Sequence, residues 1–142
     1  MEAYCAVALE IWVERETGRV RINRVSAAVD TSEVVNPDGV RNQIEGGIIQ
    51  SASWTLFECV TFDRTRVTSV DWSAYPIMRF ASVPQQIEVH ILDQPGASFL
   101  GAGEAAQGPT GAAIANAVRD AIGHRLRDLP LRADRIKSAI GT

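Results

Sequence analysis

An α+β fold is predicted by the way apolar residues repeat along this 142-residue chain. The chain begins with an apolar, β-branched stretch and continues with one in which apolar and polar residues alternate, as they do in half-buried strands. Further along, apolar residues recur every third or fourth position in two long stretches, as they do in amphipathic helices. We therefore expect a single domain, residues 1–142, with the order β-β-α-β-β-β-α, in which an antiparallel sheet packs against two main helices.

The first two strands are predicted over residues 4–14 and 19–30. Apolar residues of the second strand alternate, with one slip in register, through Val20, Ile22, Val25 and Ala27. Glu16-Thr17-Gly18 has the length and composition of a hairpin turn, and Gly18 is free to take a positive φ. These features predict an antiparallel hairpin at the start of the domain.

The first long helix is predicted from about Pro37 to Glu58, with Asn36 as its N-cap. One face carries apolar residues at four-residue intervals: Val40, Ile44, Ile48, Ala52 and Leu56. A neighbouring face carries Gln43, Gly47, Gln50 and Trp54. A glycine inside a helix costs about 1 kcal/mol relative to alanine, so the Gly46-Gly47 pair indicates that another group packs closely against this helix.

The middle of the chain predicts three more extended segments. Residues 60–63 and 66–72 suit a second hairpin, and residues 75–80 suit a short extended piece. The clean alternation of residues 86–92 predicts a half-buried strand.

The second main helix is predicted to begin at Pro109, with Gly123 at its C-terminal cap. Residues 126–131 are expected to form a short docking segment, and residues 132–140 a terminal helix. Nothing in the chain indicates a repeat or an interdomain linker.

The segment with the most chemical content is the glycine-rich stretch of residues 101–109, GAGEAAQGP. It places one carboxylate, Glu104, immediately before an alanine-rich helix. Glycine lets the backbone approach a bound group, and the free N–H groups of a helix start favour negative charge, so Glu104 is a candidate general base. The alternative is that Glu104 only complements the dipole of the helix. The glycine spacing matches neither a dinucleotide-binding turn nor a P-loop.

A family resemblance is carried by this loop together with residues 30–50, DTSEVVNPDGVRNQIEGGIIQ. In this order and at this separation, with Tyr75-Pro76 and residues 126–131 (LRDLPL), they resemble the C-terminal part of the molybdopterin-binding subunit of the xanthine dehydrogenase and aldehyde oxidase family. The branch that includes the isoquinoline 1-oxidoreductase beta subunit is the most similar. The resemblance covers nearly the whole chain.

The resemblance implies site residues and a cofactor. It implies that Glu104, which follows Gly103 in the Gly-x-Gly-Glu loop, faces molybdenum and acts as the base in the hydroxylation of an aldehyde or N-heterocycle. It also implies that Gln43 contacts the pterin and that Gly47 makes room for it. The cofactor would be molybdenum–molybdopterin, with the cytosine dinucleotide form as one option. From the residues alone, close packing remains the alternative explanation of Gly47.

The chain lacks other segments that the family uses to hold the cofactor, and its two cysteines, Cys5 and Cys59, form no iron–sulfur ligand set. We therefore expect a fragment or small subunit of a molybdenum hydroxylase, which works with the remainder of the molybdopterin-binding subunit and with an iron–sulfur subunit. Alone it should be inactive, without tightly bound cofactor, and prone to form homo-oligomers. The alternative is a non-catalytic, oligomeric α+β module.

Composition argues against two other classes of function. A net charge of −3, with both signs spread along the chain, provides no basic surface for nucleic acid. No apolar run reaches the length of a membrane span, and the N-terminus has no secretory signal pattern. We expect a cytoplasmic protein, or a periplasmic one if it belongs to an exported complex. Both cysteines lie in apolar contexts and are expected to be free thiols.

Overall fold

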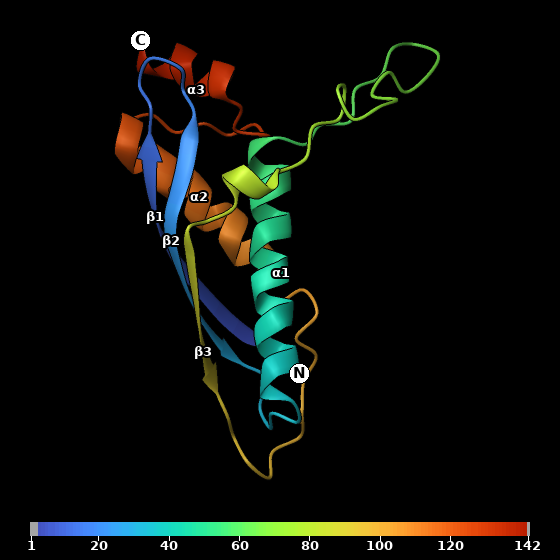
Figure 1. Cartoon of the computed structure of the whole chain (residues 1–142), viewed down its shortest axis with the longest axis vertical. Helices are drawn as coiled ribbons and strands as arrows, with labels where there is room; N and C mark the ends of the chain where they lie inside the picture. Colours follow the sequence, from blue (N-terminus) through green and yellow to red (C-terminus); the bar gives the residue numbers. More distant parts are fainter. Residues whose placement is uncertain (1–2, 142) are drawn as a thin grey trace.

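The sheet of this protein has three strands in the order β1-β2-β3 (Figure 1). The computed structural model describes residues 3–141. Strand β1 (Tyr4–Val13) pairs antiparallel with β2 (Val20–Asp30), and β3 (Gln86–Leu92) pairs parallel with β2. The α+β class is confirmed, but the sheet is mixed, not purely antiparallel. The chain leaves β2 and returns through a helical crossover, and such a connection brings the next strand back in the same direction.

The hairpin has the register slip that the sequence predicts. Glu10 lies opposite Arg24 and Ile11 lies opposite Ile22, so Asn23 is the extra residue of a β-bulge. The turn places Gly18 at a φ of 75°. Because the bulge absorbs one residue, apolar side chains on both sides of it face the same core.

Helix α1 (Pro37–Leu56) begins and ends close to its predicted limits. The side-chain oxygen of Asn36 accepts a hydrogen bond of 3.0 Å from the backbone N–H of Gly39, which confirms the predicted N-cap. Helix α2 (Gln107–Ile122) begins two residues before Pro109, and Gly123 caps it with a φ of 81°. Helix α3 (Ala133–Ile140) follows, and the buried Leu131 before it donates its N–H to the Thr55 carbonyl at 2.7 Å.

The helices bury one face of the sheet. The core is formed by apolar side chains from β2, α1, α2, α3 and β3, including Val25, Val29, Ile44, Ile48, Ile114, Val118, Ile136 and Val89. Along β1 the alternate side chains that point away from this core are exposed, and Tyr4 and Trp12 are the large ones among them. The sheet therefore presents an uncovered face in this chain. Of the helices in residues 3–141, none combines the length and the apolar character that a bilayer crossing requires.

The region between α1 and β3 differs from the prediction. Residues 60–72 make only a single antiparallel bridge, between Phe62 and Val67, and residues 75–80 are not a strand. A 3-10 helix, η1 (Phe80–Ser82), leads into β3. The β-forming side chains of this region find no core face to pack on, and Pro76 lacks an N–H to donate, so ladders do not extend.

Candidate functional site

Gln43 and the glycine-rich loop, which lie 60 residues apart in sequence, meet in the structure. Nε2 of Gln43 donates a hydrogen bond of 2.9 Å to the carbonyl oxygen of Gly103. Gln43 projects from the second turn of α1, whose direction is fixed by the Asn36 cap and Pro37. The structure therefore brings together two of the residues that the sequence singles out.

A cavity of about 430 Å³ lies beside this contact. It is bounded by the end of β2, the start of α1 and the loop, through Thr31, Glu33, Asn36, Gln43, Phe99 and Gly103. Thr31 is 2% exposed, and its hydroxyl oxygen has no hydrogen-bond partner among the described residues. A buried hydroxyl without a partner costs about 1–3 kcal/mol, so this one marks a place where a bound polar group would be stabilised.

Glu104 follows Gly103 directly but does not line this cavity. Its side chain is exposed, and within residues 3–141 its carboxylate has neither a hydrogen-bond nor an ion-pair partner. Its backbone carbonyl accepts a hydrogen bond of 3.1 Å from the N–H of Gln107 as the chain enters α2. The role of Glu104 as a base thus stays a prediction.

Gly47 is buried against the start of α2. A methyl group placed on it would lie 3.7 Å from both Ala106 Cβ and Gln107 Cγ, an ordinary contact distance. Gln107 is held there by two further bonds, because Nε2 donates to Gln50 Oε1 at 2.8 Å and the backbone carbonyl accepts from Ser51 Oγ at 2.7 Å. The face of α1 that carries Gln43, Gly47 and Gln50 therefore fixes the loop and the first turn of α2.

Two contributors to the site were missed in the sequence. Gln107 lies inside the glycine-rich stretch. The only sequence signal for its hydrogen bond to Gln50 is that both side chains are amides, which can pair with each other. Thr31 carries no such signal, because burial of a hydroxyl without a partner depends on the tertiary structure.

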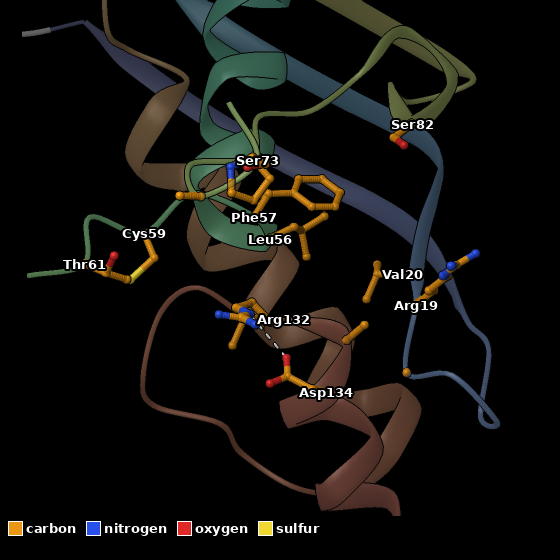
Figure 2. Close-up of a pocket in the computed structure, with 15 residues that line it drawn as sticks. Arg19, Val20, Leu56, Phe57, Cys59, Thr61, Ser73, Ser82, Arg132 and Asp134 are labelled. Atoms are coloured by element: carbon orange, nitrogen blue, oxygen red, sulfur yellow. Dashed lines mark ion pairs between the residues drawn. The ribbon is translucent and has the colours of Figure 1, made fainter. Parts of the chain in front are cut away.

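A second, larger cavity of about 710 Å³ lies at the other end of α1. Figure 2 shows it between the β1–β2 turn, the end of α1 and the start of α3. Leu56, Phe57 and Val20 contribute apolar walls, and an ion pair of 3.3 Å joins Arg132 to Asp134 at its rim. The sequence did not predict this cavity.

The family of this chain follows from a family model. Residues 1–84 match the model of the molybdopterin cofactor-binding domain. The chain belongs to this family. The resemblance to the molybdopterin-binding subunits of xanthine dehydrogenases and aldehyde oxidases is thereby confirmed.

Similar proteins include a nicotinate dehydrogenase subunit of Pseudomonas putida, which is 43% identical over 98% of this chain and 12% of that protein. The beta subunit of isoquinoline 1-oxidoreductase from Brevundimonas diminuta is 35% identical over 92% of this chain and 16% of that protein. The crystal structure of quinoline 2-oxidoreductase from Pseudomonas putida 86 matches 94% of this chain and 18% of that chain, with a TM-score of 0.83 and 28% identity. The chain thus spans less than a fifth of the length of these relatives.

Proposed function

We propose that this chain is one part of a molybdenum hydroxylase and forms one wall of its molybdopterin site. The hydrogen bond between Gln43 and Gly103 is the observation that carries the proposal, because it joins the two segments on which the family resemblance depends. The relatives are named for nicotinate, isoquinoline and aldehyde, so the substrate class is an N-heterocycle or an aldehyde. Because the chain spans a small part of those proteins, the remainder of the molybdopterin-binding subunit and an iron–sulfur subunit are its expected partners.

The residues around the smaller cavity fit part of a pterin site. The Thr31 hydroxyl is buried without a partner, and Oε1 of Gln43 is free to accept a hydrogen bond, since the described contact uses only Nε2. Apart from its two chain neighbours, no described residue has an atom within 4 Å of the position that a Cβ on Gly103 would take, so a ligand can approach its backbone closely. Thr31, Gln43 and Gly103 would hold one side of the cofactor. The cofactor, when bound, supplies the redox chemistry of hydroxylation.

Glu104 would serve as the base of that reaction. Its carboxylate is exposed and, within residues 3–141, forms no hydrogen bond or ion pair, so it is available to take a proton. The Gln43–Gly103 hydrogen bond fixes the backbone on one side of Glu104, and the Gln107–Glu104 backbone bond fixes it on the other. The backbone that carries the carboxylate is therefore fixed before a partner covers the loop, and only the rotamer freedom of the side chain itself is left to lose.

The test is turnover of the assembled enzyme, in which the chain is purified with the polypeptide that carries the remaining molybdopterin-binding part. Glu104→Gln should lower kcat by about 10²- to 10⁴-fold with molybdenum content unchanged, because it removes the base but keeps the side-chain shape. Glu16→Gln, at the exposed hairpin turn, is the matched control and should keep the wild-type rate. Wild-type turnover by Glu104→Gln would exclude the proposed role.

A second candidate function is a non-catalytic oligomeric module. It is favoured by the uncovered face of the sheet, where Tyr4 and Trp12 are exposed. The two functions are separated by measuring the molybdenum content of the chain purified alone and of the assembled enzyme. We expect no molybdenum in the lone chain and stoichiometric molybdenum in the assembly, and molybdenum absent from both would favour the module.

A further inference from the structure

The segment of residues 58–76, here called the arm, leaves the C-terminal end of α1 and projects away from the sheet and helices (Figure 1). We propose that the arm is a docking surface for the polypeptide that supplies the remainder of the molybdopterin-binding subunit. This inference rests on the proposed function. It concerns the opposite end of α1 from Gln43 and the glycine-rich loop.

The arm carries an unusual number of exposed apolar side chains for its length. Each of the following is at least half exposed: Val60, Phe62, Val67, Val70 and Trp72. A single exposed apolar residue is common on a protein surface, but a cluster of this kind is typical of an interaction site. Exposed aromatic residues such as Phe62 and Trp72 are also the side chains that most often anchor interfaces.

Local hydrogen bonds hold the arm in shape, although no core supports it. Oδ1 of Asp63 accepts from the N–H and hydroxyl of Thr65 and from the N–H of Arg66, at 2.7–3.0 Å. Asp71 caps a second turn in the same way, by accepting from Ser73. A segment that is ordered before binding loses less conformational entropy when a partner arrives.

The base of the arm is fixed to α1 by a small polar cluster. The hydroxyl of Tyr75 donates a hydrogen bond of 2.8 Å to Glu58 Oε2, and the Ser53 hydroxyl donates to the other oxygen of that carboxylate. The N–H of Met78 donates to Ser53 Oγ at 2.9 Å. Both ends of the arm therefore converge on the last turns of α1, which sets the direction in which it projects.

The docking surface continues from the arm into the larger cavity. Cys59, Thr61 and Ser73 at the base of the arm line it on one side (Figure 2). Leu56 and Leu131 line its interior, so it can receive an apolar side chain of a partner. The proposed docking surface thus combines a projecting arm, which a partner can contact from outside, with a cavity that can receive a partner side chain.

The family match and the length of the relatives indicate which polypeptide docks on the arm. The family match extends through residue 84, so the whole arm belongs to the family domain. The chain spans only 12% and 16% of two relatives, so most of the polypeptide of such proteins lies outside it. Within the described residues Arg64 and Arg66 have no ion-pair partner. The arm also carries the carboxylates of Glu58, Asp63 and Asp71, so its charges are mixed, and the expected partner surface is apolar with polar groups at its edge.

The test uses a defined probe: the similar Pseudomonas putida nicotinate dehydrogenase polypeptide without the segment that aligns with this chain, with its folding verified by circular dichroism. The affinity of this chain for the probe is measured for wild type, for the double variant Phe62→Ser/Trp72→Ser and for Trp12→Ser. Trp12 is a matched control, because it is an exposed indole (53%, against 66% for Trp72) that lies on β1. We expect the double variant to bind at least about 100-fold more weakly, and Trp12→Ser to bind within about threefold of wild type.

Three outcomes would overturn the inference: no binding of the probe by wild-type chain, wild-type affinity in the double variant, or an equal loss in Trp12→Ser. A dimer of the chain that disappears in the double variant, without binding of the probe, would identify the occupant as a second copy. Thermal unfolding verifies that the variants fold, as expected for exposed positions.

The Glu104→Gln variant separates this inference from the proposed function, because it should bind the probe as tightly as wild type does. If it binds normally and the turnover of the assembled enzyme does not depend on Glu104, the proposed function is refuted but the arm inference stands.

Discussion

Replacement of Gly18 by alanine should push the turn between β1 and β2 away from α3, and so destabilise the fold. Gly18 has a φ of 75°, and a Cβ added to it would lie 2.0 Å from the carbonyl oxygen of Ala133 and 2.7 Å from the backbone N of Lys137. These are backbone atoms that no side-chain rotation can move. The turn or α3 must therefore shift, which loosens the packing of Ile136, a side chain with 0% exposure.

The expected cost has two parts. An alanine in the left-handed region costs about 1 kcal/mol, and loss of the buried Ile136 side chain from the core adds about 1.5–3 kcal/mol. Gly18→Ala should therefore lower the free energy of unfolding by about 2.5–4 kcal/mol. Gly96→Ala provides the matched control, because Gly96 has a similar φ of 84° but no atom within 4 Å of the added Cβ, and it should cost only the first part.

Urea unfolding followed by circular dichroism measures both free energies under the same conditions. A difference of about 1.5 kcal/mol or more between the two variants is expected. If Gly18→Ala and Gly96→Ala were equally stable within about 0.5 kcal/mol, the close approach of the turn to α3 would be refuted.

Three further changes test other parts of the structure. Gly46→Ala should raise the free energy of unfolding by about 0.5–1 kcal/mol in urea titrations, because this helical glycine has no atom within 4 Å of an added Cβ. Ile114→Ala should lower it by about 2–5 kcal/mol, since the side chain is fully buried and leaves a cavity. The hydrogen bond from the Tyr75 hydroxyl to Glu58 raises the pKa of Tyr75. This contact therefore stabilises the fold fully below the ordinary pKa of tyrosine, about 10, and the stabilisation is lost as the pH rises through the raised pKa. In a Tyr4→Phe background, ultraviolet titration of the one remaining tyrosine should show that Glu58→Gln lowers its pKa; an unchanged pKa would contradict the contact.

Local patterns predicted the elements whose determinants lie close together in sequence. The change from two-residue to three-residue spacing between Ile22 and Val25 predicted the slip that the structure shows as a bulge at Asn23. Asn36-Pro37 predicted the start of α1, and Gly123 predicted the end of α2. In each case one or two neighbouring residues determine the backbone conformation directly.

The features that local patterns did not predict depend on distant partners. Residues 60–72 have good β propensity, but they project from the core and form only the Phe62–Val67 bridge. The parallel direction of β3 is set by the route of the chain around α1, which no residue of β3 encodes. At the candidate site, the sequence indicated Gln43 and Gly103 separately, whereas their hydrogen bond and the unpartnered Thr31 hydroxyl arise only from tertiary packing.

The parallel pairing of β3 with β2 has a consequence for the order in which the molecule folds. Strands β1 and β2 are joined by a short turn, but β3 can join them only after residues 31–85 have closed into a loop. Closure of so long a loop is entropically costly until α1 has formed and packed, so β3 should add late in folding and detach early in unfolding. Its detachment would uncover the backbone edge of β2 beside Val25 and Val29, and a strand edge with apolar neighbours is a site from which aggregation begins.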